Sequence, residues 1–207
     1  MVIDTGLGNL RSVERALVHA AELARHPNLQ VLRSADAEQV GSADLLVFPG
    51  QGAFRDCMAK LSGGLGEALL AGIRRGTPYL GICLGLQVLF ESSDEAPGIP
   101  GLGLYAGRVT RLDPTGVKIP HMGWNQLEVR GEGHPFVAAA GGAGAWVYFV
   151  HSFHAAPTDP SLVVATVEHG KNRVTAALAQ DNVFAAQFHP EKSQGAGLRL
   201  LQAFLSC

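Results

Sequence analysis

Gly81-Ile82-Cys83-Leu84-Gly85 is the stretch of this 207-residue chain that decides its fold. The apolar run Thr77–Ile82 is expected to form a short buried strand, and Leu86–Glu91 is expected to form the first turns of a helix. A nucleophile flanked by glycines between a strand and a helix is typical of a nucleophile elbow, in which a strained turn exposes the side chain. Free N–H groups at the start of the helix would favour the thiolate of Cys83. A buried structural cysteine is the alternative, and the two glycines count against it.

Length and composition indicate one domain over residues 1–207. Apolar residues make up 47% of the chain, an ordinary fraction for a globular protein. The formal charge of −2 gives no reason to expect binding to nucleic acid or to a membrane. No apolar run reaches the roughly 18 residues of a transmembrane span, and the first residues lack the features of a secretion signal. The cysteines share no metal or redox spacing, so a cytoplasmic protein is expected.

Strands and helices are expected to alternate in the first half of the chain. The expected strands cover residues 2–4, 29–33, 43–49 and 77–82, and the expected helices cover residues 9–25, 53–61 and 65–75. This alternation favours an α/β fold with a doubly wound, mostly parallel sheet and helices on both faces. In the second half, strands at 145–152, 162–169, 173–179 and 183–188 follow one another closely, which predicts an antiparallel β extension. A surface loop is expected over 138–145 and a last helix over 196–205.

Phe188-His189-Pro190-Glu191 directly follows the last expected strand and supplies the partners that a thiol nucleophile needs. His189 and Glu191 are two residues apart, so both can point the same way across a strand end, and Pro190 fixes the backbone between them. In the triad that results, Cys83 attacks, His189 transfers the proton and Glu191 orients the imidazole. By itself this motif is more often a surface turn. It gains weight because it and the elbow both lie at C-terminal strand ends, where open α/β sheets bind ligands.

The extended elbow Gly81–Gln87, together with Gln187–Glu191, resembles the class I (triad) glutamine amidotransferases. The resemblance implies the fold of that family and the hydrolysis of glutamine by Cys83, His189 and Glu191. It implies no metal and no organic cofactor.

Further stretches resemble one group within this family, the glutaminase subunits of the synthase that builds the imidazole ring in histidine biosynthesis. These stretches are Asp4–Ser12, Pro49–Phe54, Pro120–Asn125, Tyr148–Ser152 and His189–Ser193. The resemblance implies a heterodimer with a separate (β/α)8-barrel cyclase subunit, which receives the ammonia. A glutaminase that serves a synthase of the anthranilate, 4-amino-4-deoxychorismate or GMP type is the alternative.

The resemblance also implies roles for residues outside the triad. Backbone N–H groups of the oxyanion hole are expected from Gly50, Gln51, Gly52 and Leu84. Residues expected to bind the glutamine are Gln87, Glu95, His151 and Ser152, with Glu95 near the α-amino group. Residues expected at the partner interface are Asn9, Arg11, Trp124, Asn125, Tyr148 and Lys192, with Trp124 and Asn125 on an exposed loop.

Two positions depart from the family pattern. Thr5 stands where the family usually has an aromatic residue, and Gln51 stands where it usually has a small apolar one. A dinucleotide-binding loop after Gly6 is disfavoured, because Arg11 occupies the position of its last glycine. A metal site at His151 and His154 is disfavoured, because no third ligand lies at suitable spacing.

Two other classes of protein remain as alternatives to a glutaminase. A non-catalytic docking subunit is disfavoured by the intact set of Cys83, His189 and Glu191. A cysteine peptidase gives no reason for Gln87 and Glu95.

Overall fold

A computed structural model describes residues 1–26, 28–131 and 133–207 and places an eight-stranded sheet at the centre of the protein. The strand order is β2-β1-β3-β4-β13-β12-β11-β8. The parallel strands are β1 (Val2–Ile3), β2 (Arg33–Ser34), β3 (Leu46–Gly50), β4 (Tyr79–Cys83) and β13 (Val183–Ala186). The antiparallel strands that extend this sheet are β12 (Asn172–Gln180), β11 (Val163–His169) and β8 (Glu128–Val129). The predicted fold class is confirmed.

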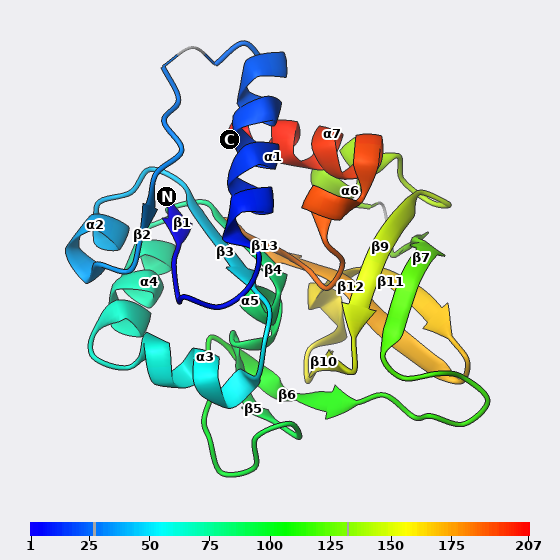
Figure 1. The fold of residues 1–207 in the computed structure, drawn as a ribbon. Coiled ribbons are helices and arrows are strands. Elements are labelled where there is room, and N and C mark those ends of the chain that lie inside the picture. Colours follow the sequence, from blue (N-terminus) through cyan, green and yellow to red (C-terminus); the bar gives the residue numbers. More distant parts are fainter. Residues whose placement is uncertain (27, 132) are drawn as a thin grey trace.

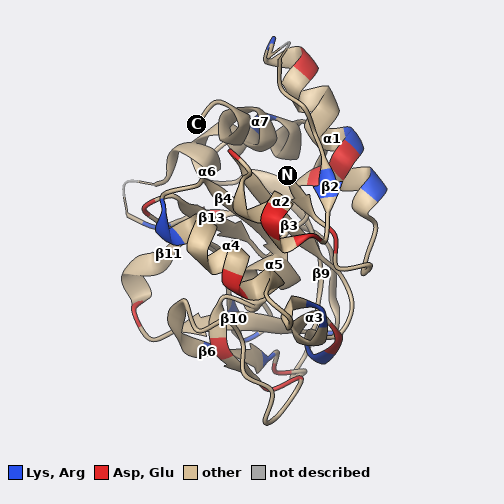
Figure 2. Cartoon of the chain, turned by 90° about the vertical axis from the view of Figure 1, so that its left-hand side faces the viewer, with Lys and Arg blue, Asp and Glu red and all other residues tan. Residues whose placement is uncertain are grey.

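Helices cover both faces of the sheet (Figure 1). One face carries α1 (Leu10–Leu23), α6 (Pro135–Ala140) and α7 (Gln194–Leu205). The other face carries α2 (Ala37–Gly41), α3 (Phe54–Leu61) and α4 (Leu65–Arg74). Acidic and basic residues both occur along α1, so this helix presents no patch of a single charge (Figure 2).

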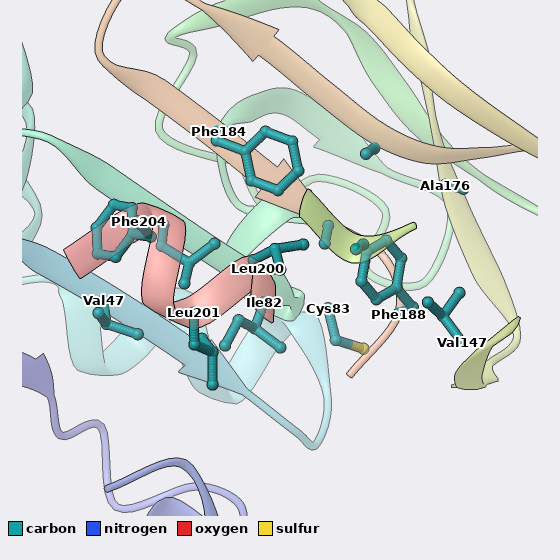
Figure 3. Close-up of a cluster of buried hydrophobic side chains, with 14 of the residues drawn as sticks. Val47, Ile82, Cys83, Val147, Ala176, Phe184, Phe188, Leu200, Leu201 and Phe204 are labelled. Carbon is teal, nitrogen blue, oxygen red and sulfur yellow. The ribbon is translucent and has the colours of Figure 1, made fainter. Parts of the chain in front are cut away.

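Each central strand is buried on both faces, which explains why these strands are apolar throughout. Val47 packs toward α1 and α7, whereas its neighbours Leu46 and Phe48 pack toward α3 and α4. Figure 3 shows the first of these two cores, in which Phe184 of β13 lies among apolar side chains of α7. The reactive end of β4 is thereby held between two cores.

Two smaller sheets complete the fold. A three-stranded sheet has the order β10-β6-β5, with β5 (Phe90–Ser93), β6 (Tyr105–Arg111) and β10 (Phe153–Pro157). A two-stranded antiparallel sheet joins β7 (His121–Gln126) to β9 (Trp146–His151). Short 3₁₀ turns lie at η1 (Pro160–Leu162) and η2 (Pro190–Lys192). Among the described residues, no helix has the length and hydropathy needed to cross a membrane.

The structure corrects the expected helix after the elbow. Helix α5 covers only Leu84–Gln87, and the chain enters β5 at Phe90. Residues 84–90 are buried all round, so their hydrophobicity has no helical period that could mark where a helix stops. A helix of four residues still presents free N–H groups to Cys83, but its macrodipole is small.

Three other expectations are wrong in extent. Residues 28–32 lie outside any strand, because β2 pairs with the two-residue strand β1 and is limited to Arg33–Ser34. The loop expected over 138–145 is partly helix α6, whose start is marked by a His134 cap and by a proline in the first turn. The loop expected around Trp124 is strand β7.

Candidate active site

Cys83 is the last residue of β4 and the N-cap of α5, and its backbone is strained. Its φ of 54° and ψ of −103° are uncommon for a residue with a side chain. The flanking glycines are required by close backbone contacts. A Cβ on Gly81 would lie 2.6 Å from the carbonyl oxygen of Gly85, and a Cβ on Gly85 would lie 2.0 Å from that of Phe48. The backbone therefore has the geometry of a nucleophile elbow.

His189 and Glu191 form a buried pair beside the elbow. Nδ1 of His189 lies 2.8 Å from Oε1 of Glu191, and the two side chains are 1% and 2% exposed. Since the carboxylate accepts from Nδ1, the Nε2 atom is left for proton transfer, and it has no hydrogen-bond partner among the described residues.

The pKa of His189 is set by opposing effects. Burial lowers this pKa, but hydrogen bonding and charge interactions with Cys83 and Glu191 outweigh the burial and raise the pKa to about 10. Nε2 makes no hydrogen bond to any described residue, whereas the hydrogen bond from Nδ1 to Glu191 is well formed at 2.8 Å. The raised pKa of His189 favours the protonated imidazolium form of the ring.

Ser193 ties the catalytic turn to strand β9. Its hydroxyl donates to the carbonyl oxygen of His189 at 2.7 Å and accepts from the backbone N–H of Tyr148 at 3.0 Å. The N–H of His189 donates in turn to the carbonyl oxygen of Tyr148 at 2.9 Å. These three bonds fix the imidazole-bearing turn against β9. Ser193 lies in a stretch that resembles the family, but no role was predicted for it from the sequence.

A cavity of about 400 Å³ opens in front of the sulfur. The residues that line it are Gln51, Gly52, Cys83, Leu84, Gln87, Glu95, Pro120, Val150, His151, Ser152, Phe153 and Lys192. The cavity brings together the proposed nucleophile and most residues expected to bind substrate or the oxyanion. A larger cavity of about 550 Å³ lies near Met1 and Leu45, and none of the predicted site residues is among the described residues that line it.

Gly50 does not line this cavity. It ends β3, pairs with Cys83 and lies behind Leu84, where a Cβ would come within 2.5 Å of the Leu84 Cβ. Close packing therefore accounts for this glycine. Gln51 and Gly52 remain the candidates on this loop for donors to an oxyanion.

Contacts within the protein limit what Gln87 and Glu95 can offer a ligand. Nε2 of Gln87 donates to the carbonyl oxygen of Phe153 and to Oε1 of Gln187, both at 3.0 Å, so its Oε1 remains as an acceptor. Oε2 of Glu95 accepts from the N–H of Phe54 at 3.1 Å, at the start of α3. The other carboxylate oxygen of Glu95 is left for a cationic group.

A chain of hydrogen bonds runs from β7 to the cavity wall. Asn125 Nδ2 lies 3.3 Å from His121 Nε2, His121 Nδ1 lies 3.1 Å from His151 Nε2, and His151 Nδ1 lies 2.9 Å from the carbonyl oxygen of Phe153. Because the carbonyl can only accept, every donor in the chain points toward Phe153 and both rings are neutral. Both ring nitrogens of His151 are thus occupied. Among the described residues, no group of three or more His, Cys, Asp or Glu is arranged to hold a metal ion.

The two histidines of this chain predict a loss of stability in mild acid. Burial and the neighbouring histidines lower the pKa of His151 to about 3, and burial together with His169 lowers the pKa of His121 to about 4. In the unfolded chain these two histidines bind protons below about pH 6.5, whereas in the folded chain they do not bind protons until about pH 4. The free energy of unfolding should therefore decrease as the pH is lowered from about 6.5 to about 4, by up to roughly 1.4 kcal/mol per pH unit for each histidine.

Urea unfolding at several pH values between 7 and 4.5 measures this effect. The variant His151→Gln, which cannot titrate, should show a shallower dependence on pH than the parent chain. The variant His19→Gln changes an exposed histidine on α1 and should leave the dependence unchanged. An equal free energy of unfolding at pH 7 and pH 5 in the parent would contradict the prediction.

The loop that follows β3 packs against the N-terminal loop. Gly52 has a φ of +113°, and a Cβ on Gly8 would lie 3.0 Å from the Cβ and 3.2 Å from the N of Gln51. Asn9, predicted at the interface, caps α1 by accepting from the N–H of Ser12 at 3.3 Å. A small cavity bordered by Asn9, Gln51 and Glu191 places the N-terminal loop beside the buried His–Glu pair.

One face of the β7–β9 sheet is apolar and exposed. Trp124 pairs with Tyr148 across the strands, with ring centroids 5.9 Å apart, and Lys192 Nζ lies 5.8 Å from the Tyr148 ring centroid. Met122 and Trp146 share this face and are 63% and 53% exposed. We call the residues Met122, Trp124, Gln126, Trp146, Tyr148 and Val150 the β7–β9 face.

The six residues expected at the interface are not all equivalent. Trp124, Tyr148 and Lys192 form one group on the β7–β9 face and beside it. Asn125 points to the opposite side, where its amide is bonded to His121 and to the carbonyl oxygen of Glu168. Arg11 lies on α1 and is exposed. Met122 and Trp146 were missed, although period-2 alternation along the two strands could have identified them.

Over residues 1–206 the chain matches the family model for glutamine amidotransferase class-I. The chain belongs to this family. Relatives that are 44% to 48% identical to this chain carry the name imidazole glycerol phosphate synthase subunit HisH, and two of them serve as examples. The relative from Thermosynechococcus vestitus is 48% identical over 99% of this chain and 95% of its own length. The relative from Methanothermobacter thermautotrophicus is 47% identical over 99% of this chain and 96% of its own length.

Solved structures agree on the fold. A crystal structure described as a glutamine amidotransferase has a TM-score of 0.72 and 20% identity, covering 99% of this chain and 96% of that chain. The structure of PurLQS from Thermotoga maritima has a TM-score of 0.70 and 21% identity, with the same coverage of the two chains. At these identities the likeness concerns the fold alone.

Proposed function

We propose that this chain is the glutaminase subunit of an imidazole glycerol phosphate synthase. It hydrolyses glutamine to glutamate and ammonia, and it delivers the ammonia to a separate cyclase subunit. The observation that carries the proposal is that Cys83, on a strained elbow beside the His189–Glu191 pair, faces the cavity that Gln87 and Glu95 also line. The names of relatives that are nearly half identical over the whole chain support the choice of synthase.

The geometry fits a two-step acyl transfer. The Cys83 thiolate attacks the side-chain carboxamide carbon of glutamine, and the N–H groups of Leu84 and of the Gln51–Gly52 loop stabilise the oxyanion. His189 gives its Nε2 proton to the departing ammonia, which leaves a γ-glutamyl thioester. His189 then takes a proton from water, the hydroxide displaces the thiolate, and glutamate is released. Glu191 holds the ring in the tautomer that both transfers need.

The cavity walls suit the charged end of the substrate. The free carboxylate oxygen of Glu95 is an acceptor for the α-ammonium group, and Oε1 of Gln87 is a second acceptor. Ser152 and the wall at His151 close the side that faces β9. No step of this reaction calls for a metal or an organic cofactor.

The β7–β9 face is the surface proposed for the cyclase. Large exposed apolar side chains gathered on one face are typical of protein interfaces, and Trp and Tyr are common anchors in them. Lys192 lies both on the cavity wall and beside Tyr148, so the proposed interface adjoins the proposed site of ammonia release. The (β/α)8-barrel form of the partner, the heterodimer and the cytoplasmic location stay predictions.

Ammonia release tests the proposed function. The chain should form ammonia and glutamate from glutamine, and addition of a cyclase subunit with its ligand should yield imidazole glycerol phosphate. Hydrolysis of peptides without glutaminase activity would instead indicate a cysteine peptidase. Activation by an anthranilate or GMP synthase subunit, without activation by the cyclase, would indicate another synthase.

A tryptophan substitution tests the proposed surface. Trp124→Ala should weaken binding to the cyclase and its stimulation of glutamine hydrolysis, with a cost of about 2 kcal/mol or more in binding free energy if the residue is a hot spot. The melting temperature should change little, because the ring is 42% exposed. Leu23→Ala, which removes an exposed side chain on α1, is the matched control. If Trp124→Ala unfolds the chain but leaves coupling unchanged, the residue belongs to the core and not to an interface.

A further inference from the structure

One buried amide in the site has no part in the mechanism above. Gln187 is fully buried between β13 and His189, and its backbone N–H donates to the carbonyl oxygen of Ala176 at 2.9 Å. Its side-chain Nε2 lies 3.4 Å from the sulfur of Cys83. Its Oε1 accepts from Nε2 of Gln87 at 3.0 Å.

The neighbouring groups determine which end of this amide faces the sulfur. The carbonyl oxygen of Phe153 can only accept, so the Gln87 atom 3.0 Å away from it must be the amide nitrogen. That nitrogen also contacts Gln187, so the Gln187 atom facing it must be the oxygen. The other end of the Gln187 amide, its NH₂ group, is therefore the end that faces Cys83. The Phe153 carbonyl thus sets the orientation of the Gln187 amide, which is not free to take either of its two orientations.

The Phe153 carbonyl, which orients the Gln87 and Gln187 amides, is itself fully hydrogen-bonded. The Phe153 carbonyl also accepts from Nδ1 of His151 at 2.9 Å, so both of its lone pairs are occupied. Gln87 is 4% exposed, which leaves little access for water to the amide pair. Reversing the Gln187 amide would bring two nitrogens together and leave buried donors unpaired, which is costly.

We propose that Gln187 positions the Cys83 sulfur and stabilises its thiolate through a donor whose direction is set by Phe153 and Gln87. An N–H donor favours a thiolate over a thiol, because a charged acceptor makes the stronger hydrogen bond. The donor also holds the sulfur at one point of the cavity wall while Cys83 occupies its strained backbone conformation. This inference deepens the proposed function and rests on it for the role of Cys83 as nucleophile.

Alkylation of Cys83 tests the proposal without a turnover assay. The full chain carries Cys207→Ala, because Cys207 is exposed, whereas Cys57 is buried. The rate of Cys83 carboxamidomethylation by iodoacetamide is measured against pH, and the midpoint reports thiolate formation. In Gln187→Met, which keeps the volume but lacks the donor, the midpoint should rise by about one pH unit. In Gln187→Glu, which is nearly isosteric but places a carboxyl group at the sulfur, the midpoint should rise further.

Turnover and a matched variant separate this role from general packing. At neutral pH, kcat of Gln187→Met should fall about tenfold or more, with a smaller change in KM, because the fraction of reactive thiolate falls. Thr175→Val removes another buried polar group, in the sheet away from the cavity, and should keep the parental midpoint and kcat.

The outcomes distinguish this inference from the proposed function. A folded Gln187→Met variant with the parental alkylation profile and kcat would overturn the role of Gln187 and leave the nucleophile untouched. If Gln187→Met does not fold, Gln87→Met decides, since it frees the Gln187 amide to turn and should also raise the midpoint. An unchanged midpoint in that variant would contradict the argument. Glutaminase activity in a chain that lacks the Cys83 thiol would overturn Cys83 as the nucleophile. Absence of glutaminase activity in the parent chain, both alone and with the cyclase and its ligand, would overturn the proposed function itself.

Discussion

Cys83→Ala should abolish glutamine hydrolysis, with a loss in kcat of at least about 10³-fold, the scale seen when a covalent nucleophile is removed from a triad. The side chain is 8% exposed and borders the core, but it also lines the cavity, and the substitution removes only the sulfur atom. The melting temperature and the binding of the cyclase should therefore change little. Ammonia release and cyclase binding are measured on the same preparation.

The other two cysteines can serve as controls, but only Cys207 can be replaced without disturbing the core. Cys207→Ala changes an exposed thiol next to the chain end and should leave kcat unchanged. Cys57 is fully buried, and burial raises the pKa of its thiol to about 12, which makes it inert as a nucleophile. Cys57→Ala would leave a small cavity between α3 and the sheet, so a loss of stability there would say nothing of catalysis. Ammonia release by Cys83→Ala at close to the parental rate would refute the triad.

Gly52→Pro should lower glutaminase activity by about 10²- to 10³-fold, both with and without the cyclase and its ligand. Proline lacks the N–H that the oxyanion needs, and its φ near −65° cannot match the +113° of this loop. Gly52→Ala is the comparison variant, because it keeps the N–H and its Cβ would meet nothing closer than Leu7 at 3.9 Å, so that only the strain of a side chain at a φ of +113° is added. It should lose much less activity than the proline variant.

The same loop is the proposed control point of the enzyme. Hydrolysis without an acceptor wastes glutamine, and rotation of the peptide beside Gly52 could withhold one oxyanion donor until the cyclase binds its ligand. Gln51→Pro should then raise the unstimulated rate. A free chain that already turns over at the fully stimulated rate would exclude such control, and equal rates for Gly52→Pro and the parent would remove Gly52 from the oxyanion hole.

The sequence predicted what depends on local chemistry. The Cys83 elbow, the His189–Glu191 pair and the central strands β3, β4 and β13 each carry their signal in a few neighbouring residues. The extent of α5 could not be predicted, because residues 84–90 are buried on all sides and carry no periodicity. Strand β2 was misplaced because residues 29–32, three of which are apolar, resemble a strand, although the two residues of β1 limit the pairing.

The polar network of the site lay beyond sequence reasoning for a different reason. Gln187 is 104 residues from Cys83 and 100 from Gln87, so only the packed sheet reveals that the three side chains meet. A glutamine in the apolar run before His189 was a signal, since buried polar groups need partners. The direction of its amide depends on the carbonyl of Phe153, which no pattern in the sequence specifies.

The hydroxyl of Ser193 has a consequence for how such a subunit can evolve. It joins the backbone of β9 to the turn that carries His189, so the exposed side chains of that strand and the imidazole share one rigid support. A lineage that adopts a different acceptor enzyme can exchange side chains on the β7–β9 face one at a time, because none of them makes these bonds. An insertion or deletion within β9 would shift Tyr148 relative to Ser193 and displace the base. Divergence among subunits with different partners should therefore proceed by substitution on this strand, at constant strand length.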